Sequence, residues 1–219
     1  MSSGCGAPPQ TVPAVPRRAV LLFVKYPEPG CVKTRLAATV GPERAAEIYR
    51  RLVAEVFARL PCDAEAIACF DPPERREEIE QWLRGIGGER ALHFLPQSAG
   101  DLGARLAHAF EETFALGFQQ IAGIGTDCVE IDAAIFSETW EALGTHEVVL
   151  GPSEDGGYFL IALAAATPAL FEKIPWSSGG VFTETLARAA SENLRVHRLP
   201  MRHDVDTEED WRRAEQRLR

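Results

Sequence analysis

The chain has 219 residues, of which 46% are hydrophobic and 25% are charged, and its formal net charge is −9. These values are typical of a water-soluble globular protein with room for one large α/β domain. The apolar runs are too short to span a bilayer, and the negative charge argues against binding to phosphate backbones. We therefore expect neither a membrane nor a nucleic acid as partner.

The first eighteen residues are rich in Gly, Pro and Ser and lack the apolar core of a targeting signal. We expect residues 1–18 to form a disordered tail and residues 19–219 to form a single domain. The five cysteines show no C-x-x-C pair and no zinc-finger spacing, which favours free thiols in a reducing cytoplasm. Cys31 and Cys128 are expected to be small buried core residues rather than nucleophiles.

From residue 19 onward, short apolar runs alternate with amphipathic segments, a pattern that predicts strands alternating with helices. The predicted strands are Ala19–Val24, Ala64–Phe70, Ala91–Leu95, Gln120–Gly125, Glu147–Gly151, Tyr158–Leu163 and Leu194–Leu199. The predicted helices are Pro42–Leu60, Pro73–Leu83, Leu102–Leu116, Ala133–Leu143 and Phe182–Ala190. The alternation predicts the α/β class, with three layers, a largely parallel Rossmann-like sheet and ligands beyond the carboxyl ends of its strands. The fifth and sixth strands leave no room for a helix between them, so we expect an antiparallel or bent segment there.

The first predicted strand leads into a turn-rich loop that carries three cations. Two prolines restrict φ in this loop, and Gly30 permits a backbone conformation closed to other residues. Lys25, Lys33 and Arg35 can then converge on one anion. The loop is not a P-loop, because no glycine precedes Lys33 and Thr34. We predict phosphate or nucleotide contacts from Lys25, Gly30, Lys33, Thr34 and Arg35; a strand-to-helix connection with solvated cations is the alternative.

Two acidic segments are candidates for a metal site. Asp127 follows a short apolar strand, and Asp206 precedes Thr207 and Asp210, which have the spacing of a helix capping box. Mg²⁺ and Mn²⁺ prefer oxygen ligands, and Mg²⁺ usually binds one or two carboxylates together with phosphates. We predict Asp127 and Asp206 as metal ligands and keep Asp204 in reserve, because we expect only one of that extended pair to face the site. An Asx turn or a helix cap is the alternative role for Asp127.

Glycine- and hydroxyl-rich segments are candidates for substrate contacts. The segment Asp155–Tyr158 allows a sharp turn with an accessible backbone, although a plain hairpin turn is the alternative. The segment Trp176–Gly180 precedes a helix, which its hydroxyls could cap instead. Asp101 stands either at a helix start or against a nucleotide. The predicted substrate contacts are Asp155, Gly156, Gly157, Tyr158, Trp176 and Ser177, with Asp101 assigned to the nucleotide.

In combination, these segments resemble a bacterial family of glycosyltransferase-A-like proteins, often labelled radical-SAM/selenodomain-associated transferase or uncharacterised glycosyltransferase. The motifs occur in the family's order: Phe23–Leu36, Gly100–Gly103, Gly125–Cys128, Gly151–Tyr158, Trp176–Ser178 and Asp204–Thr207. The chain is more distantly similar to the molybdenum-cofactor and 2-phospholactate guanylyltransferases. The resemblance implies a nucleotide-diphospho-sugar transferase fold that binds a nucleotide in its amino-terminal half. It assigns metal binding to Asp127 and Asp206, and phosphate binding to Lys33 and Arg35.

The resemblance implies a Mg²⁺- or Mn²⁺-dependent transferase and leaves two reactions open. A nucleotidyltransferase would bring an acceptor phosphate to the α-phosphorus of a nucleoside triphosphate, whereas a glycosyltransferase would bring an acceptor to the sugar carbon of a nucleotide sugar. In both, Lys33, Arg35 and Asp127 would be catalytic. The first loop lacks the Gly-Gly-x-Gly-x-Arg pattern of well-characterised nucleotidyltransferases, so the sequence does not choose between the two. A non-catalytic nucleotide-binding module that serves a partner enzyme is the rival function, and a nucleotide hydrolase is a third.

Overall fold

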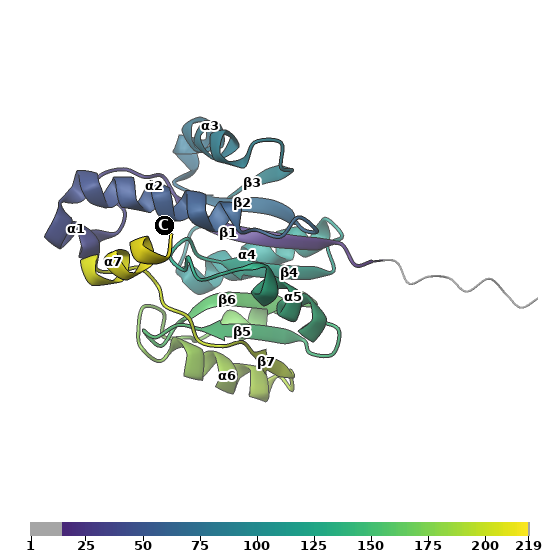
Figure 1. Ribbon diagram of the computed structural model, residues 1–219. Coiled ribbons are helices and arrows are strands. Elements are labelled where there is room, and N and C mark those ends of the chain that lie inside the picture. The colour runs from purple at the N-terminus through teal and green to yellow at the C-terminus, as the bar shows by residue number, and fades with distance from the viewer. Residues whose placement is uncertain (1–14, 219) are drawn as a thin grey trace, which may run out of the picture.

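Seven strands form one mixed sheet in the computed structural model, which describes residues 15–218 (Figure 1). The strands are β1 (Arg18–Lys25), β2 (Glu65–Asp71), β3 (Leu92–Pro96), β4 (Gln120–Ile124), β5 (Val148–Pro152), β6 (Tyr158–Leu163) and β7 (Val196–Arg198). Their order in the sheet is β3-β2-β1-β4-β6-β5-β7. Only β6 runs opposite to its neighbours, β4 and β5; the other pairings are parallel. The antiparallel pairing expected for the fifth and sixth strands is confirmed.

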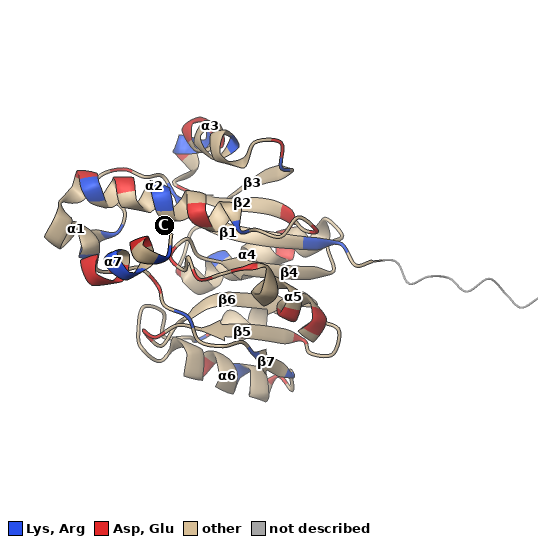
Figure 2. Ribbon diagram, viewed as in Figure 1, with Lys and Arg blue, Asp and Glu red and all other residues tan. Residues whose placement is uncertain are grey.

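Helices cover both faces of the sheet, so the predicted three-layer α/β architecture is confirmed. The helices are α1 (Thr34–Val40), α2 (Pro42–Ala58), α3 (Arg76–Gly87), α4 (Leu102–Ala115), α5 (Ala133–Ala142), α6 (Val181–Ser191) and α7 (Glu208–Arg217). Two short 3₁₀ helices span Pro73–Arg75 and Pro168–Phe171. Charged residues lie mainly on the helices and loops, and the central strands are largely free of them (Figure 2).

The core divides at the sheet because side chains alternate between its faces. On β1, Val20, Leu22 and Val24 pack in one cluster with α2, α3, α5 and α7, whereas Ala19 and Leu21 pack in the other with α4 and α6. Both faces are therefore buried, as the continuous apolar run of this strand indicates.

The amino-terminal boundary of β1 lies at Arg18. Arg17 forms an ion pair with Glu65 at 3.0 Å, and the Arg18 side chain donates to Gln120 at 3.0 Å. The remainder of the predicted tail, residues 1–14, lies outside the described residues. Between residues 15 and 218 the structure contains no helix that is both long and apolar enough to cross a membrane.

The carboxyl-terminal segment crosses the top of the sheet before α7 begins. Leu199 donates its backbone N–H to Leu150, Arg202 donates to Pro152, and Val205 donates to Asp127 at 3.0 Å. The buried side chain of Val205 anchors this path in the core. The segment thereby carries the predicted acidic positions from the β5 edge to the end of β4.

The final helix, α7, begins with the predicted capping box. The Asp210 N–H donates to the Thr207 hydroxyl, and the Asp210 carboxylate accepts from the Thr207 N–H at 2.9 Å. The cap fixes the backbone directly after Asp206. Helix α7 also contacts α1 (Figure 1), so it joins the end of the chain to the loop after β1.

We expect Thr207→Ala to lower the free energy of unfolding by about 1 kcal/mol, because alanine lacks the hydroxyl that accepts from the Asp210 N–H. Urea unfolding measures the loss. Thr207→Ser keeps the hydroxyl and should retain most of the stability. If the alanine variant were as stable as the wild type, the box would not be what holds the start of α7.

Candidate functional site

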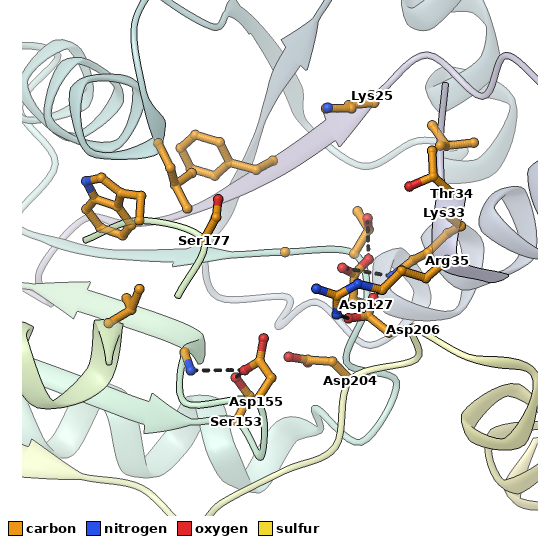
Figure 3. Close-up of a pocket in the computed structure, with 18 of the residues that line it drawn as sticks. Lys25, Lys33, Thr34, Arg35, Asp127, Ser153, Asp155, Ser177, Asp204 and Asp206 are labelled. Atoms are coloured by element: carbon orange, nitrogen blue, oxygen red, sulfur yellow. Dashed lines mark hydrogen bonds and ion pairs between the residues drawn. The ribbon is translucent and has the colours of Figure 1, made fainter. Parts of the chain in front are cut away.

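A cavity of about 780 Å³ opens beyond the carboxyl ends of β1 and β4 (Figure 3). Five segments supply most of its lining: the end of β1 with the loop into α1, the end of β4, the β5–β6 turn, the loop before α6, and the segment before α7. Tyr49 of α2 and Leu102 of α4 complete it. Ligands of parallel α/β sheets bind at this edge. The predicted site residues in the lining are Lys25, Lys33, Thr34, Arg35, Asp127, Asp155, Gly157, Tyr158, Trp176, Ser177 and Asp206.

The ammonium of Lys33 lies between the two predicted metal ligands. Its Nζ is 2.9 Å from Asp127 Oδ2 and 3.0 Å from Asp206 Oδ1, and the side chain is only 6% exposed. Burial alone would lower the pKa of Lys33, but the carboxylates of Asp127 and Asp206 outweigh it and raise the pKa. Arg35 adds a longer ion pair, 3.4 Å, to Asp206 Oδ2. The sequence therefore brings these four charges together as expected, with the cations bound to the carboxylates.

Lys33 is held in this position by an unusual backbone conformation. It is the N-cap of α1 with φ of 47° and no side-chain cap hydrogen bond. Residues other than glycine seldom adopt positive φ, and such strain clusters at ligand-binding sites. Ser177, on the other side of the cavity, has φ of 64°. Two of the four non-glycine residues with positive φ in the described chain therefore line this one cavity.

The hydroxyl of Tyr49 links the end of β1 to the residue that precedes Asp127. It accepts from the Lys25 backbone N–H at 2.9 Å and lies 3.4 Å from the Thr126 hydroxyl, which is 3.4 Å from Asp127 Oδ1. Burial raises the pKa of Tyr49 to about 12, and its oxygen accepts from both the Lys25 N–H and the Thr126 hydroxyl. The sequence analysis missed this role. Tyr49 belongs to the apolar face of α2, and nothing in that pattern marks its hydroxyl.

Asp204 also lines the cavity, which corrects the expectation that only one of the pair Asp204 and Asp206 could face it. Residues two apart in extended backbone point to the same side, so both carboxylates reach the site. Burial, followed by the negative charges of Asp127 and Asp155, raises the pKa of Asp204 to about 7. The cavity therefore holds more carboxylate than its cations neutralise.

The β5–β6 turn forms the opposite wall of the cavity. One carboxylate oxygen of Asp155 accepts from the Ser153 hydroxyl at 2.6 Å and from the Gly157 N–H at 2.9 Å. Gly156 has φ of 86°, and its carbonyl accepts from the Phe182 N–H at 2.8 Å. A Cβ at this position would lie 2.1 Å from the carbonyl oxygen of Gly179. The turn and the loop before α6 are thus in direct backbone contact and form one wall.

Two aromatic rings complete this wall. Trp176 meets Tyr158 edge to face, with ring centroids 6.4 Å apart. The Trp176 indole also lies against Gly103, where a Cβ would be 2.5 Å from its Nε1. The glycine of the predicted Gly100–Gly103 motif is therefore needed for packing of the indole onto the start of α4.

Other predicted residues lie elsewhere. Gly30 and Gly156 are not in the cavity lining, although both have the positive φ expected of turn glycines. Asp101 lines a neighbouring cavity of about 610 Å³, and its carboxylate caps α4 by accepting from the Ala104 N–H at 2.9 Å. Cys128 is buried as expected, and burial raises the pKa of its thiol. The expectation for Cys31 is wrong: this residue is exposed and lines the main cavity, because the turn before α1 leaves it outside the core.

The carboxylates fit a divalent cation in part. Within residues 15–218, no cluster of three or more Asp, Glu, His or Cys side chains is arranged to hold a metal ion alone. Asp127 and Asp206 nevertheless approach one cation, the Lys33 ammonium, from two sides. Two carboxylates with further oxygens from a phosphate are the usual donor set for Mg²⁺. The residues present therefore match a metal ion that binds together with a phosphate ligand.

The chain belongs to the family described as "Uncharacterized protein conserved in bacteria" (DUF2064), which matches residues 53–178. No curated protein matches the chain. A solved structure from Desulfovibrio desulfuricans G20, provisionally described as a nucleotide-diphospho-sugar transferase, is 32% identical with a TM-score of 0.79, over 88% of this chain and 84% of that one. The predicted fold is thereby confirmed, and the predicted association with radical-SAM proteins stays a prediction.

More distant structures share the fold. A 4-diphosphocytidyl-2C-methyl-D-erythritol synthase from Anaerococcus prevotii DSM 20548 is 12% identical with a TM-score of 0.61, over 93% of this chain and 96% of that one. A CMP:2-keto-3-deoxy-manno-octonic acid synthetase, solved in complex with CTP, is 12% identical with a TM-score of 0.57, over 92% of this chain and 98% of that one. At these identities the similarity concerns the fold alone.

We expect Gly156→Ala to destabilise the protein more than Gly117→Ala does. Both glycines have φ of 86°, a conformation in which alanine is strained. Only the Cβ at position 156 would collide with Gly179, whereas the Cβ at position 117 meets nothing closer than the tip of the Arg17 side chain, at 3.7 Å. Chemical denaturation of both variants isolates the contact between turn and loop. Equal losses of unfolding free energy would contradict that contact.

Proposed function

We propose that this chain is a divalent-metal-dependent transferase that acts on a nucleotide-activated substrate. The observation that carries the proposal is the meeting of Lys33, Asp127 and Asp206 at the carboxyl edge of the sheet. The name given to the Desulfovibrio relative supports it, and the CTP complex of a distant neighbour agrees with nucleotide use on this fold. A non-catalytic module would not need two carboxylates poised around one cation.

Phosphate binding would begin at Lys25. In the described chain its ammonium has no ion-pair partner, and it lines both the main cavity and the adjoining one. Lys33 and Arg35 are engaged by carboxylates in this structure. They can turn to phosphate oxygens once Asp127 and Asp206 have another cation to bind. In this proposal Lys25 binds phosphate first, and Lys33 and Arg35 bind it after a metal ion has replaced them at the carboxylates.

Asp127 and Asp206 would hold Mg²⁺ or Mn²⁺, with Asp204 as a further carboxylate in the same lining. Such an ion would neutralise negative charge on the departing diphosphate or pyrophosphate. The contribution of the chain itself is positioning: Tyr49 and Thr126 orient Asp127, and the capping box of α7 orients Asp206. Lys33 and Arg35 would stabilise charge that develops on the phosphates during transfer.

In this proposal the two sides of the main cavity receive the two substrates. The nucleotide would lie along β1 and the loop into α1, and the acceptor would lie against the β5–β6 turn and the loop before α6. Nucleotidyl transfer and glycosyl transfer both fit this division. Nucleoside triphosphates and nucleotide sugars are cytoplasmic metabolites, so the proposal places the chain in the cytoplasm.

A thermal-shift screen of nucleoside triphosphates and nucleotide sugars, with and without Mg²⁺ or Mn²⁺, tests the proposal. A ligand at a hundred times its dissociation constant should add about 2.7 kcal/mol of apparent stability. Asp127→Asn and Asp206→Asn should remove the metal-dependent part of the shift. Asp63→Asn is the matched control, because Asp63 is exposed and pairs with Arg18 away from the cavity. An unchanged metal-dependent shift in both site variants would contradict the assignment of metal ligands.

Lys33→Met should tighten binding of Mg²⁺ in the absence of nucleotide by about tenfold or more. The reason is that the variant removes a positive charge that competes for the same two carboxylates in a half-buried site. Isothermal titration calorimetry measures the affinity, and Lys25→Met provides a control that removes a cation not paired with those carboxylates. Weaker Mg²⁺ binding in Lys33→Met would show that the ammonium and the metal do not share a position.

A further inference from the structure

We propose that the acceptor is an uncharged, hydroxyl-bearing molecule such as a sugar or polyol, and not a phosphomonoester. The inference rests on the proposed function, because it concerns the acceptor half of the same cavity. It is carried by the distribution of charge and of polar side chains around that cavity.

The charged residues of the cavity are unevenly spread. The cations are Lys25, Lys33 and Arg35, and the anions are Asp127, Asp155, Asp204 and Asp206. The three cations come from the end of β1, the loop into α1 and the first turn of α1. Lys33 and Arg35 are in ion pairs with Asp127 and Asp206. Asp155 and Asp204 remain, and no cation pairs with either of them in the described chain.

These two carboxylates face the acceptor half. Figure 3 shows Asp155 and Asp204 pointing toward each other on one side of the cavity, with Lys25 on the opposite side. Within residues 15–218, the β5–β6 turn and the loop before α6 contribute no Lys or Arg to the lining. A phosphomonoester placed against this wall would meet the carboxyl groups of Asp155 and Asp204 and no Lys or Arg from either loop. The wall therefore selects against phosphorylated acceptors by repulsion.

The other side chains of this wall suit hydroxyl groups. Ser177 and Ser178 line the cavity, and the strained backbone at Ser177, with φ of 64°, presents its side chain there (Figure 3). One oxygen of Asp155 holds the turn through Ser153 and Gly157, which leaves the second oxygen to accept from a ligand hydroxyl.

An apolar surface lies beside these hydrogen-bonding groups. Trp176 and Tyr158 provide aromatic area in the same wall. An uncharged polyol can use both features of this wall. Its C–H groups pack on the aromatic rings, and its hydroxyls donate hydrogen bonds to the neighbouring acceptors. Transfer to a hydroxyl is thereby favoured over attack by an acceptor phosphate.

Fluorescence quenching of Trp176 measures the local charge without any substrate. Caesium and iodide ions are the probes, applied to the full chain at constant ionic strength of about 0.15 M, where charges beyond about 8 Å are screened. Subtracting the Trp176→Phe signal isolates this indole. Each ion's quenching is divided by its quenching of free N-acetyltryptophanamide, because the two ions differ in intrinsic efficiency. On this normalised scale we expect caesium to quench Trp176 about threefold more efficiently than iodide, because two unpaired carboxylates face the same wall.

Asp155→Asn should reduce that preference about twofold, because one of the two charges is removed. Glu111→Gln is the matched control: it removes the same charge from the exposed surface of α4, outside the cavity, and should leave the preference unchanged. Normalised iodide quenching equal to or stronger than normalised caesium quenching would overturn the proposal. So would a preference that Asp155→Asn and Glu111→Gln change equally.

Acceptor competition provides the second arm. The chain is incubated with Mg²⁺, a nucleotide or nucleotide sugar that it binds, and the pairs glycerol with glycerol 3-phosphate and glucose with glucose 6-phosphate. Mass spectrometry should find the transferred group on the unphosphorylated member of a pair. Products on the phosphorylated member would overturn the proposal; if no pair is used, the quenching result decides. Failure to bind any nucleotide would count against the proposed function and leave the quenching result intact.

Discussion

The ammonium of Lys33 lies between the carboxylates of Asp127 and Asp206, and the site depends on this arrangement. A nearly buried cation is tolerated only when it is paired, so each of the three charges restricts where the other two can be. The contact joins three segments distant in sequence: the loop after β1, the end of β4 and the entry to α7. The helix cap at Thr207 fixes the backbone next to Asp206, and the hydroxyl of Tyr49 contacts the residue before Asp127. Both therefore help to position this contact.

The same arrangement separates the two halves of the cavity. On one side lie the cations of the β1 loop; on the other lies a wall whose two loops touch through Gly156 and Gly179. Backbone contact of this kind leaves no room for a side chain at position 156. Lys33 and Ser177, which both have positive φ, lie on opposite sides of the cavity. Backbone strain of this kind is concentrated at ligand-binding sites.

Much of this could be predicted from the sequence, because strand ends and helix caps have local signatures. The apolar run before Asp127 indicated a strand end, and the spacing of Thr207 and Asp210 indicated the start of α7. The partners of each charge could not be predicted. Pairing of Lys33 with carboxylates depends on tertiary geometry, and the role of Tyr49 depends on a single hydroxyl within an apolar helix face. The short helix α1 was missed because it has no capping side chain.

A double-mutant cycle between Lys33 and Asp206 tests the central contact most directly. Urea unfolding of Lys33→Met, Asp206→Asn and the double variant, without ligand or metal, gives the coupling free energy. The ion pair predicts that the two substitutions are coupled by about 1–3 kcal/mol, with the double variant less destabilised than the sum of the single ones. Additive effects within about 0.3 kcal/mol would contradict the account, because they would mean that these charges do not meet in the folded protein.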